Sequence, residues 1–226
     1  MALTYRSVSL VLLSVAICFL AATPSTSAVL ENRTGQVTVF WGRHREEGSL
    51  REACDTGTYT AAVMSFLNVD AARGRYDLDL SGHPLAGVGD DIKHCQRVGV
   101  HVSLSIFIVD NNNNSSLPTT NKQSALQVQL VDYLWNAYLA GGGKRNGGVH
   151  RRPFGDARLD GIDFFVNDGT PLVAQNYAVV VAGELAKRSR LTGGGAGTKP
   201  LWLTATPRCD FRGSLAAGIF EGNYFI

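Results

Sequence analysis

One stretch decides the fold of this chain: Leu159-Asp160-Gly161-Ile162-Asp163-Phe164-Phe165-Val166-Asn167. Its apolar residues predict a buried strand, and because side chains alternate between the two faces of a strand, Asp163, Phe165 and Asn167 share one face. Polar side chains that climb the interior of a barrel strand toward its C-terminal end are typical of barrel enzymes. The alternative is an ordinary barrel strand whose interior Asp163 is satisfied by hydrogen bonds. The strand by itself leaves both interpretations open.

The rest of the chain alternates apolar strands with helices. Strands are predicted at residues 36–41, 61–67, 100–108, 159–166 and 201–205, and helices at residues 49–57, 92–98, 126–139 and 170–188. Ser49 and Glu52 have capping-box spacing and are predicted to begin the first of these helices. Continuous apolar strands between helices indicate a parallel sheet that is covered on both faces. The fold class is therefore α/β, either a closed (β/α)8 barrel or an open doubly wound sheet. No Gly-x-Gly-x-x-Gly follows the first strand, which counts against a dinucleotide-binding sheet without choosing between the two folds.

Composition and charge suit one globular domain. Of the 226 residues, 45% are hydrophobic and 18% are charged, and the formal net charge is +2. Acidic and basic residues are interspersed along most of the chain, so nothing points to a nucleic acid or a membrane as a partner.

Residues 1–28 are predicted to be a secretory signal peptide. An apolar run at residues 8–22 follows Arg6, and Thr26-Ser27-Ala28 offers a small-residue cleavage site. An apolar run of about 15 residues is short for a membrane span and typical of a signal peptide, the alternatives being a retained anchor or a buried first helix. Residues 29–226 would then form one extracellular domain, with candidate glycosylation sites at Asn32, Asn113 and Asn114. Three cysteines would remain, Cys54, Cys95 and Cys209, and an odd number leaves one thiol without a partner within the chain.

Residues 160–167 resemble the Asp-x-x-Asp-x-Asp-x-Glu signature of glycoside hydrolase family 18. Further blocks in the same order are similar to the plant class III chitinase branch of that family, at residues 37–42, 47–50, 65–67, 80–83, 91–96, 102–106, 133–136, 152–156 and 203–206. Within this branch the chain looks most like the cereal xylanase inhibitor proteins of the class III chitinase type, whose phenylalanine in place of the third acid matches Phe165. The resemblance runs from about Gly35 to Phe220 and implies a (β/α)8 TIM barrel.

The resemblance implies that two catalytic acids are replaced. In the family the final Glu protonates the glycosidic oxygen, while the third acid orients the acetamido group of the substrate, which attacks the anomeric carbon. Here Asn167 has no titratable proton to give, so general-acid catalysis is lost, an effect typically worth about 10²–10⁴-fold in rate, and Phe165 lacks the orienting carboxylate. Asp168 is no substitute, because on a continuing strand it points to the other face. No residue of the degenerate motif, which comprises Asp160, Asp163, Phe165 and Asn167, is expected to be catalytic.

Two further departures concern the sugar site and the length of the barrel. After Ser-x-Ser-Ile the family usually has a glycine pair that lets sugar approach the backbone, whereas this chain has Phe107-Ile108-Val109, which predicts a blocked sugar-binding floor. A full barrel takes about 250 residues, whereas the recognisable blocks stop near Glu221. We therefore expect an incomplete barrel of about five to six β/α units with an exposed edge at its fifth strand. The resemblance also implies a disulfide between Cys54 and Cys95 and leaves Cys209 unpaired.

The resemblance implies a secreted, catalytically inactive defence protein of the plant apoplast that inhibits microbial family 11 xylanases. Its inhibitory loop is predicted to follow the fourth helix, in the basic, glycine-rich residues 186–199, which include Arg188, Arg190 and Lys199. The guanidinium that meets the carboxylates of the target could come from Arg188 or Arg190, and Arg190 is favoured because it lies nearer the glycines. The alternative to an inhibitory loop is a helix end whose basic side chains favour the helix dipole. Family 10 xylanases, which the resembling inhibitors meet through a late helix, are not expected to be inhibited.

Alternative functions are a lectin or a residual chitinase that binds chitin oligosaccharides, or a non-functional truncated remnant. No cofactor, metal ion, nucleic acid or membrane is expected as a partner.

Overall fold

The computed structural model describes residues 36–109, 120–141, 144–145, 148–149, 151–166, 172–192 and 200–207. These residues fall within one structural unit, which begins at Gln36. The predicted signal peptide and several predicted sites lie outside the described residues: Asn32, Asn113, Asn114, Asn167, Asp168, Lys199 and Cys209.

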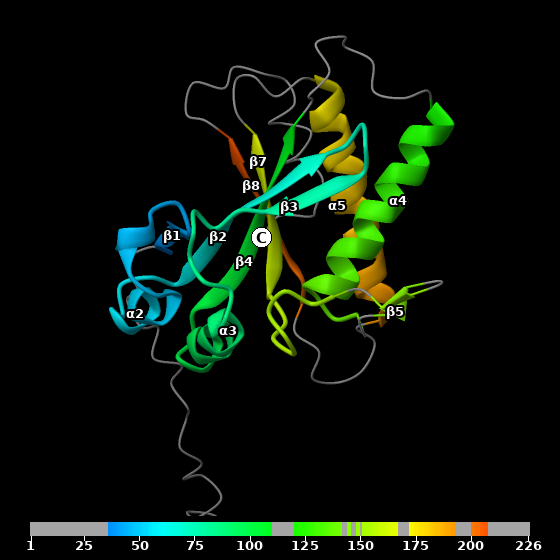
Figure 1. Cartoon of the computed structure of the whole chain (residues 1–226). Helices are drawn as coiled ribbons and strands as arrows, with labels where there is room; N and C mark the ends of the chain where they lie inside the picture. The colour runs from blue at the N-terminus through cyan, green and yellow to red at the C-terminus, as the bar shows by residue number, and fades with distance from the viewer. Residues whose placement is uncertain are drawn as a thin grey trace, which may run out of the picture. The chain divides into compact units, whose positions relative to one another are not determined.

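Five parallel strands lie side by side in the order in which they follow one another along the chain (Figure 1). They are β1 (Thr38–Trp41), β2 (Ala61–Asp70), β4 (His101–Val109), β7 (Gly161–Val166) and β8 (Trp202–Pro207). A doubly wound sheet reverses its strand order at a switch point, whereas a barrel keeps the order of the chain. The unbroken order therefore decides between the two predicted folds, and the described strands form part of a (β/α)8 barrel.

The second strand is longer than predicted and has an extra partner. It continues beyond Leu67 to Asp70, and a short strand β3 (Arg75–Leu78) returns antiparallel along its C-terminal half. Gly74, at a φ of +63°, closes the turn between them and donates its N–H to the carbonyl of Asp70 at 2.8 Å. This hairpin was missed because β3 is short and its side chains are only partly buried.

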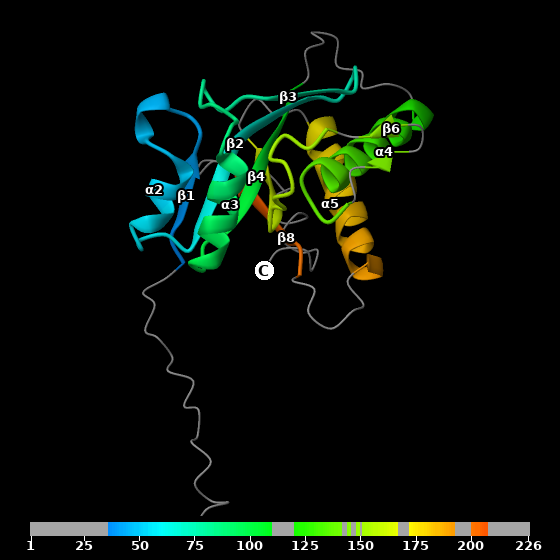
Figure 2. The same ribbon diagram turned by 60° about the horizontal axis from the view of Figure 1, so that its bottom comes forward.

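Four helices of the described residues connect the parallel strands: α2 (Leu50–Asp55), α3 (Val88–Arg97), α4 (Thr120–Ala137) and α5 (Leu172–Thr192). A 3-10 turn η1 (Arg45–Glu47) follows β1, and a small hairpin of β5 (Lys144–Arg145) and β6 (Gly148–Val149) follows α4. In Figure 2, α2 lies beside α3 and α4 lies beside α5. The core is one cluster of buried apolar residues from strands and helices, with Ile162, Leu104, Leu134 and Val181 among its members.

The helix boundaries follow local chemistry. Ser49 begins α2 with the predicted capping box: its hydroxyl accepts the N–H of Glu52 at 3.2 Å, and the Glu52 carboxylate accepts the N–H of Ser49 at 2.7 Å. The prediction for α5 was wrong at its C-terminal end, because the helix continues past Arg188 to Thr192. Residues 186–191 are mostly good helix formers, and the first glycine comes only at Gly193. Arg188 and Arg190 therefore belong to the last turns of a helix rather than to a loop.

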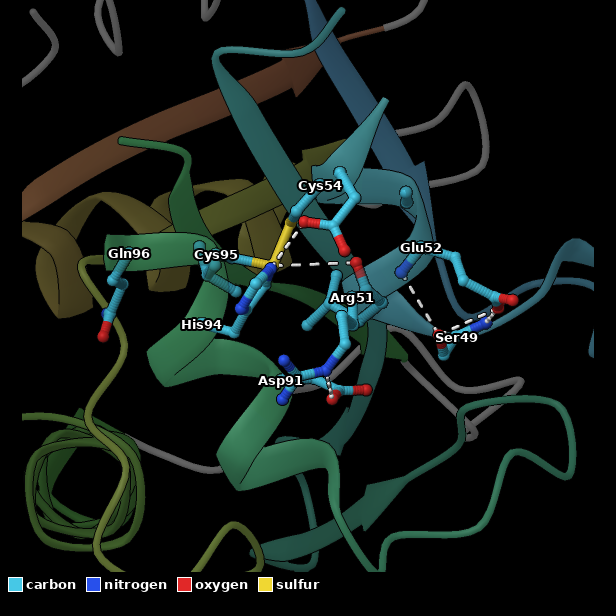
Figure 3. Close-up of a disulfide and its surroundings, with 12 residues drawn as sticks. Ser49, Arg51, Glu52, Cys54, Asp91, His94, Cys95 and Gln96 are labelled. Carbon is cyan, nitrogen blue, oxygen red and sulfur yellow. Dashed lines mark hydrogen bonds and ion pairs between the residues drawn. A yellow bond between two sulfur atoms is a disulfide. The ribbon is translucent and has the colours of Figure 1, made fainter. Parts of the chain in front are cut away.

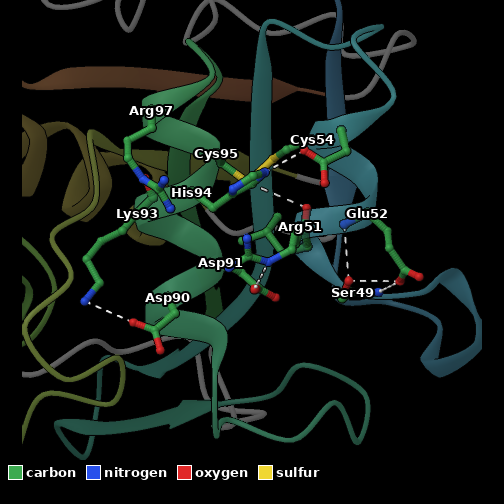
Figure 4. A network of polar contacts seen from close by, with 12 residues as sticks. Ser49, Arg51, Glu52, Cys54, Asp90, Asp91, Lys93, His94, Cys95 and Arg97 are labelled. Carbon is green, nitrogen blue, oxygen red and sulfur yellow. Dashed lines mark hydrogen bonds and ion pairs between the residues drawn. A yellow bond between two sulfur atoms is a disulfide. The ribbon is translucent and has the colours of Figure 1, made fainter.

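A disulfide joins α2 to α3, as the resemblance implied. Cys54 and Cys95 are both buried, and their Cα atoms lie 5.4 Å apart (Figure 3). Ion pairs flank the bridge on the surface of the two helices: Arg51 Nε lies 3.1 Å from Asp91 Oδ1, and His94 Nε2 contacts Asp55 Oδ1 (Figure 4). The bridge and the two ion pairs thus tie the first two connecting helices together across 41 residues of sequence.

Removing this disulfide is expected to destabilise the protein. Closing a loop of 41 residues constrains the unfolded chain, and its loss in a Cys54→Ala, Cys95→Ala variant should lower the free energy of unfolding by about 3–4 kcal/mol. Urea unfolding of the variant against the parent measures the loss, and Cys209→Ala is the control that should change little. Peptide mapping without reduction should show Cys54 linked to Cys95; a Cys54–Cys209 bridge would contradict the pairing.

Candidate functional site

Asp163 occupies the inner face of the sheet and is fully committed to neighbouring hydroxyls. Its side chain accepts a hydrogen bond from Ser105 of β4 at 2.7 Å on Oδ2, and bonds from Thr204 and Thr206 of β8 at 2.7 and 2.9 Å on Oδ1. The residue is 1% exposed. Burial raises the pKa of Asp163, and the three hydroxyl donors offset this rise only in part. Among the described residues, Asp163 therefore acts as a structural bridge across β4, β7 and β8.

Replacing Asp163 with alanine is expected to cost about 2–3 kcal/mol of stability, because it leaves buried hydroxyl donors without an acceptor. Asp163→Asn is the matched control, since its amide oxygen still accepts from Thr204 and Thr206 and its NH₂ can donate to Ser105. Because the folded pKa of Asp163 is raised above its ordinary value of 3.8, the folded state binds the proton more tightly than the unfolded state.

The parent should therefore lose stability as the pH rises from 3.8, the ordinary pKa of an aspartate, through the raised pKa of Asp163 in the folded protein. Urea unfolding across this range should show that loss in the parent and not in Asp163→Asn. A parent and an Asp163→Asn variant with parallel stability profiles would contradict the burial argument.

Asp160, the first acid of the signature, lies where β7 begins and serves packing. Its Oδ2 accepts the backbone N–H of Val102 at 2.9 Å and the side-chain amide of Gln96 at 2.9 Å. The same amide also donates to the carbonyl of Arg158 at 2.7 Å. Asp160 thus joins α3, β4 and the start of β7, at the end of the strand opposite to Phe165.

Gly161 is the signature position at which any side chain would collide with the next strand. A Cβ built there would lie 2.2 Å from the carbonyl oxygen of Trp202 and 2.7 Å from its Cβ. Space over this glycine lets Trp202 of β8 reach across β7 to stack on His101 of β4, with ring centroids 3.7 Å apart. The glycine is therefore explained by close strand contact rather than by chemistry.

Phe165 places an aromatic ring two residues after Asp163 on β7. Four half-buried rings from four strands gather here: the ring of Phe165 lies 5.0 Å from that of Phe66, 6.0 Å from Phe107 and 6.5 Å from Phe40. The guanidinium of Arg43 lies over the Phe66 ring at 5.1 Å. Phe107 belongs to the segment predicted to block the sugar-binding floor, and it is the register partner of Phe165. An aromatic layer thus covers the C-terminal side of Asp163.

Glu47 organises the loop that follows β1, a role that the sequence analysis missed. Its Oε1 accepts the backbone N–H groups of Gly42, Arg43 and His44 at 2.7, 2.9 and 3.0 Å, and lies 3.3 Å from His83 Nε2. Burial acts to raise the pKa of Glu47, but these hydrogen bonds together outweigh it and lower the pKa. Glu47 and His83 belong to the blocks at residues 47–50 and 80–83 that resemble the family. Nothing in the sequence of either block shows that the two side chains contact each other.

The two arginines predicted for inhibition have different surroundings. Arg188 turns to α4, where its Nη2 lies 2.6 Å from Asp132 Oδ1 and its Cζ lies 5.9 Å from the centroid of the Trp135 ring. Arg190 is exposed in the last turn of α5. The structure therefore distinguishes the two candidates by their surroundings: Arg188 is packed against α4, and Arg190 is exposed.

A pocket of about 510 Å³ lies beside this helix end. It opens at the N-terminal ends of β7 and β8, so it is not at the end of the barrel where the family keeps its catalytic acids. Its walls come from the starts of these strands, the C-terminal ends of α4 and α5, and α3: Gln96, Trp135, Leu139, Ala140, Arg158, Leu159, Asp160, Ser189, Thr192, Pro200 and Leu201.

Within the part of the chain that the structure describes, no helix is long and apolar enough to cross a membrane. The chain matches no protein-family model.

Two cereal proteins are similar to the chain over most of its length. It is 54% identical over 218 residues to Xylanase inhibitor protein 1 of Triticum aestivum, covering 94% of this chain and 66% of the relative. It is 41% identical over 216 residues to Xylanase inhibitor protein XIP of Oryza sativa subsp. japonica, covering 93% of this chain and 68% of the relative. The chain spans 55 to 68% of the length of the four xylanase inhibitor proteins that it matches.

Solved structures agree with the fold. A chitinase from Ipomoea carnea is 27% identical, with a TM-score of 0.66, over 84% of this chain and 65% of that chain. A xylanase and alpha-amylase inhibitor protein from Scadoxus multiflorus is 31% identical, with a TM-score of 0.64, over 84% of this chain and 63% of that chain. The strand order and these similarities lead to one conclusion. The chain belongs to the branch of glycoside hydrolase family 18 that holds the plant class III chitinases and the cereal xylanase inhibitor proteins.

Proposed function

We propose that this chain is a secreted, catalytically silent inhibitor of microbial family 11 xylanases that acts in the plant apoplast. The observation that carries the proposal is the state of β7. Its interior carboxyl, Asp163, is buried and bound by three hydroxyls, and the next interior position holds the ring of Phe165. A buried, hydrogen-bonded carboxyl cannot reach a sugar, and a phenyl ring cannot orient an acetamido group. Identity of 41–54% to xylanase inhibitor proteins supports the inhibitory role.

Arg190 is the residue proposed to meet the target. Residues two apart on a helix point about 200° away from each other. Because Arg188 faces α4, Arg190 faces away from it, exposed on the last turn of α5. A planar guanidinium pairs well with carboxylates, and the active site of a glycosidase usually holds two of them. Its exposed position on the last turn of α5 therefore lets Arg190 reach into such a cleft.

Assays of the purified secreted protein test this proposal. It should inhibit a family 11 xylanase and release no sugar from colloidal chitin. Chitin binding without xylanase inhibition would favour a lectin, and the absence of both chitin binding and xylanase inhibition would favour a non-functional protein.

N-terminal sequencing tests the predicted signal peptide: the secreted protein should begin at Val29 if residues 1–28 are removed.

A further inference from the structure

The buried stripe of α5 ends in a charged residue. Val181 and Leu185 are fully buried, and Arg188 follows at the same helical spacing. A stripe at this spacing faces the neighbouring elements, so Arg188 comes to lie between α5 and α4 rather than on the exposed side of α5. Arg188 therefore stands at the point where the buried face of α5 reaches the end of the helix and becomes partly exposed to solvent.

Three side chains form what we call the clasp: Arg188 of α5 with Asp132 and Trp135 of α4. The guanidinium Nη2 is 2.6 Å from Asp132 Oδ1, and the Cζ lies 5.9 Å from the centroid of the Trp135 ring. Nη1 is shielded from solvent and makes no hydrogen bond to any residue that the structure describes. Asp132 and Trp135 are three residues apart on α4, so they lie on one face of that helix.

The clasp acts on the last turn of α5. The hydroxyl of Thr192 donates to the carbonyl of Arg188 at 2.9 Å, so the residue held by α4 is also tied to the final residue of the helix. Arg190 lies between these two and is exposed on the opposite side. Helix ends fray unless side chains or neighbouring elements hold them. An end that is held in place presents Arg190 in one direction, which lowers the ordering cost of binding.

We infer that Arg188 is a positioning residue: with Asp132 and Trp135 it fixes the last turn of α5 on α4 and thereby sets the direction in which Arg190 leaves the helix. The inference rests on the proposed function of Arg190. It assigns the two neighbouring arginines different tasks, one turned inward to hold the helix end and one turned outward to bind.

Arg188→Ala is the main variant. Loss of a partly exposed ion pair and a cation–π contact typically shifts a local equilibrium by about fivefold to tenfold. We expect amide hydrogen exchange at residues 189–192 to speed up by that factor, and inhibition of a family 11 xylanase to weaken by about fivefold. Arg188→Lys keeps the charge near Asp132 but lacks the planar group that lies over Trp135, so its effect should be intermediate. Lys187→Ala is the matched control. It removes the same charge from the neighbouring residue, whose side chain is 64% exposed.

A double-mutant cycle distinguishes positioning from direct contact. If Arg188 acts through Arg190, then Arg188→Ala should have little further effect on inhibition in an Arg190→Ala background. Additive losses would show that Arg188 contacts the xylanase itself, and unchanged exchange at residues 189–192 would show that the clasp does not hold the helix end; either result overturns the inference. If the parent does not inhibit the xylanase at all, the proposed function fails, while the exchange rates still decide whether the clasp exists.

Discussion

Colloidal chitin should release sugar with this protein at least about 100-fold more slowly than with an active class III chitinase. The resemblance implies that the general acid of the family stands at the position of Asn167, and an amide has no titratable proton to give. The family also needs a carboxylate at the position of Phe165, where the structure has a ring packed against Phe66 and Phe107. Sugar release by equal concentrations of the two proteins, measured across acidic and neutral pH, gives the comparison. Robust hydrolysis by the unmodified protein would contradict the proposed function.

Restoring one acid should not restore the enzyme. Asn167→Glu alone is expected to recover little activity, because the Phe165 ring still occupies the place of the acid that orients the acetamido group. The matched variant carries Phe165→Asp together with Asn167→Glu, and it should exceed the single variant if the two acids act together. Full recovery by Asn167→Glu alone would show that Phe165 does not obstruct the sugar.

Arg190→Ala is expected to weaken inhibition of a family 11 xylanase by roughly 30-fold or more. Loss of a guanidinium that pairs with carboxylates in a buried interface typically costs about 2–5 kcal/mol. Inhibition constants of the parent and the variant measure the effect. Most of the change should appear as faster dissociation, because truncating one partner of a buried charge pair mainly affects the off-rate.

A control accompanies this measurement. Lys187→Ala removes a charge from the same helix, where the only ion pair that the structure describes for Lys187 is to Glu184 at 3.8 Å, and it should change inhibition little. Equal inhibition constants for the parent and Arg190→Ala would show that the assignment to Arg190 is wrong.

Sequence patterns predicted those features of the fold that depend only on residues close together in the chain. The Ser49–Glu52 capping box was confirmed because its partners are three residues apart. The hairpin of β2 and β3 was missed. The predicted end of α5 was four residues too early, because the helix continues through Ser189–Thr192 and ends just before Gly193. The ends of helices and strands are difficult to predict because one stretch of sequence can favour helix, strand and turn at the same time.

The sequence by itself determined the family, the alternation of strands and helices, and the shared face of Asp163 and Phe165. Only the tertiary structure decided what these residues do. Asp163 became a structural bridge because Ser105, Thr204 and Thr206, 58, 41 and 43 residues away, bring their hydroxyls to it. Likewise Arg188 and Arg190 carry the same charge but differ in surroundings, because the packing of α5 brings Arg188 onto Asp132 and Trp135 of α4 and leaves Arg190 exposed. Periodicity records which side of an element a residue faces, whereas its partners are set by the packing of distant elements.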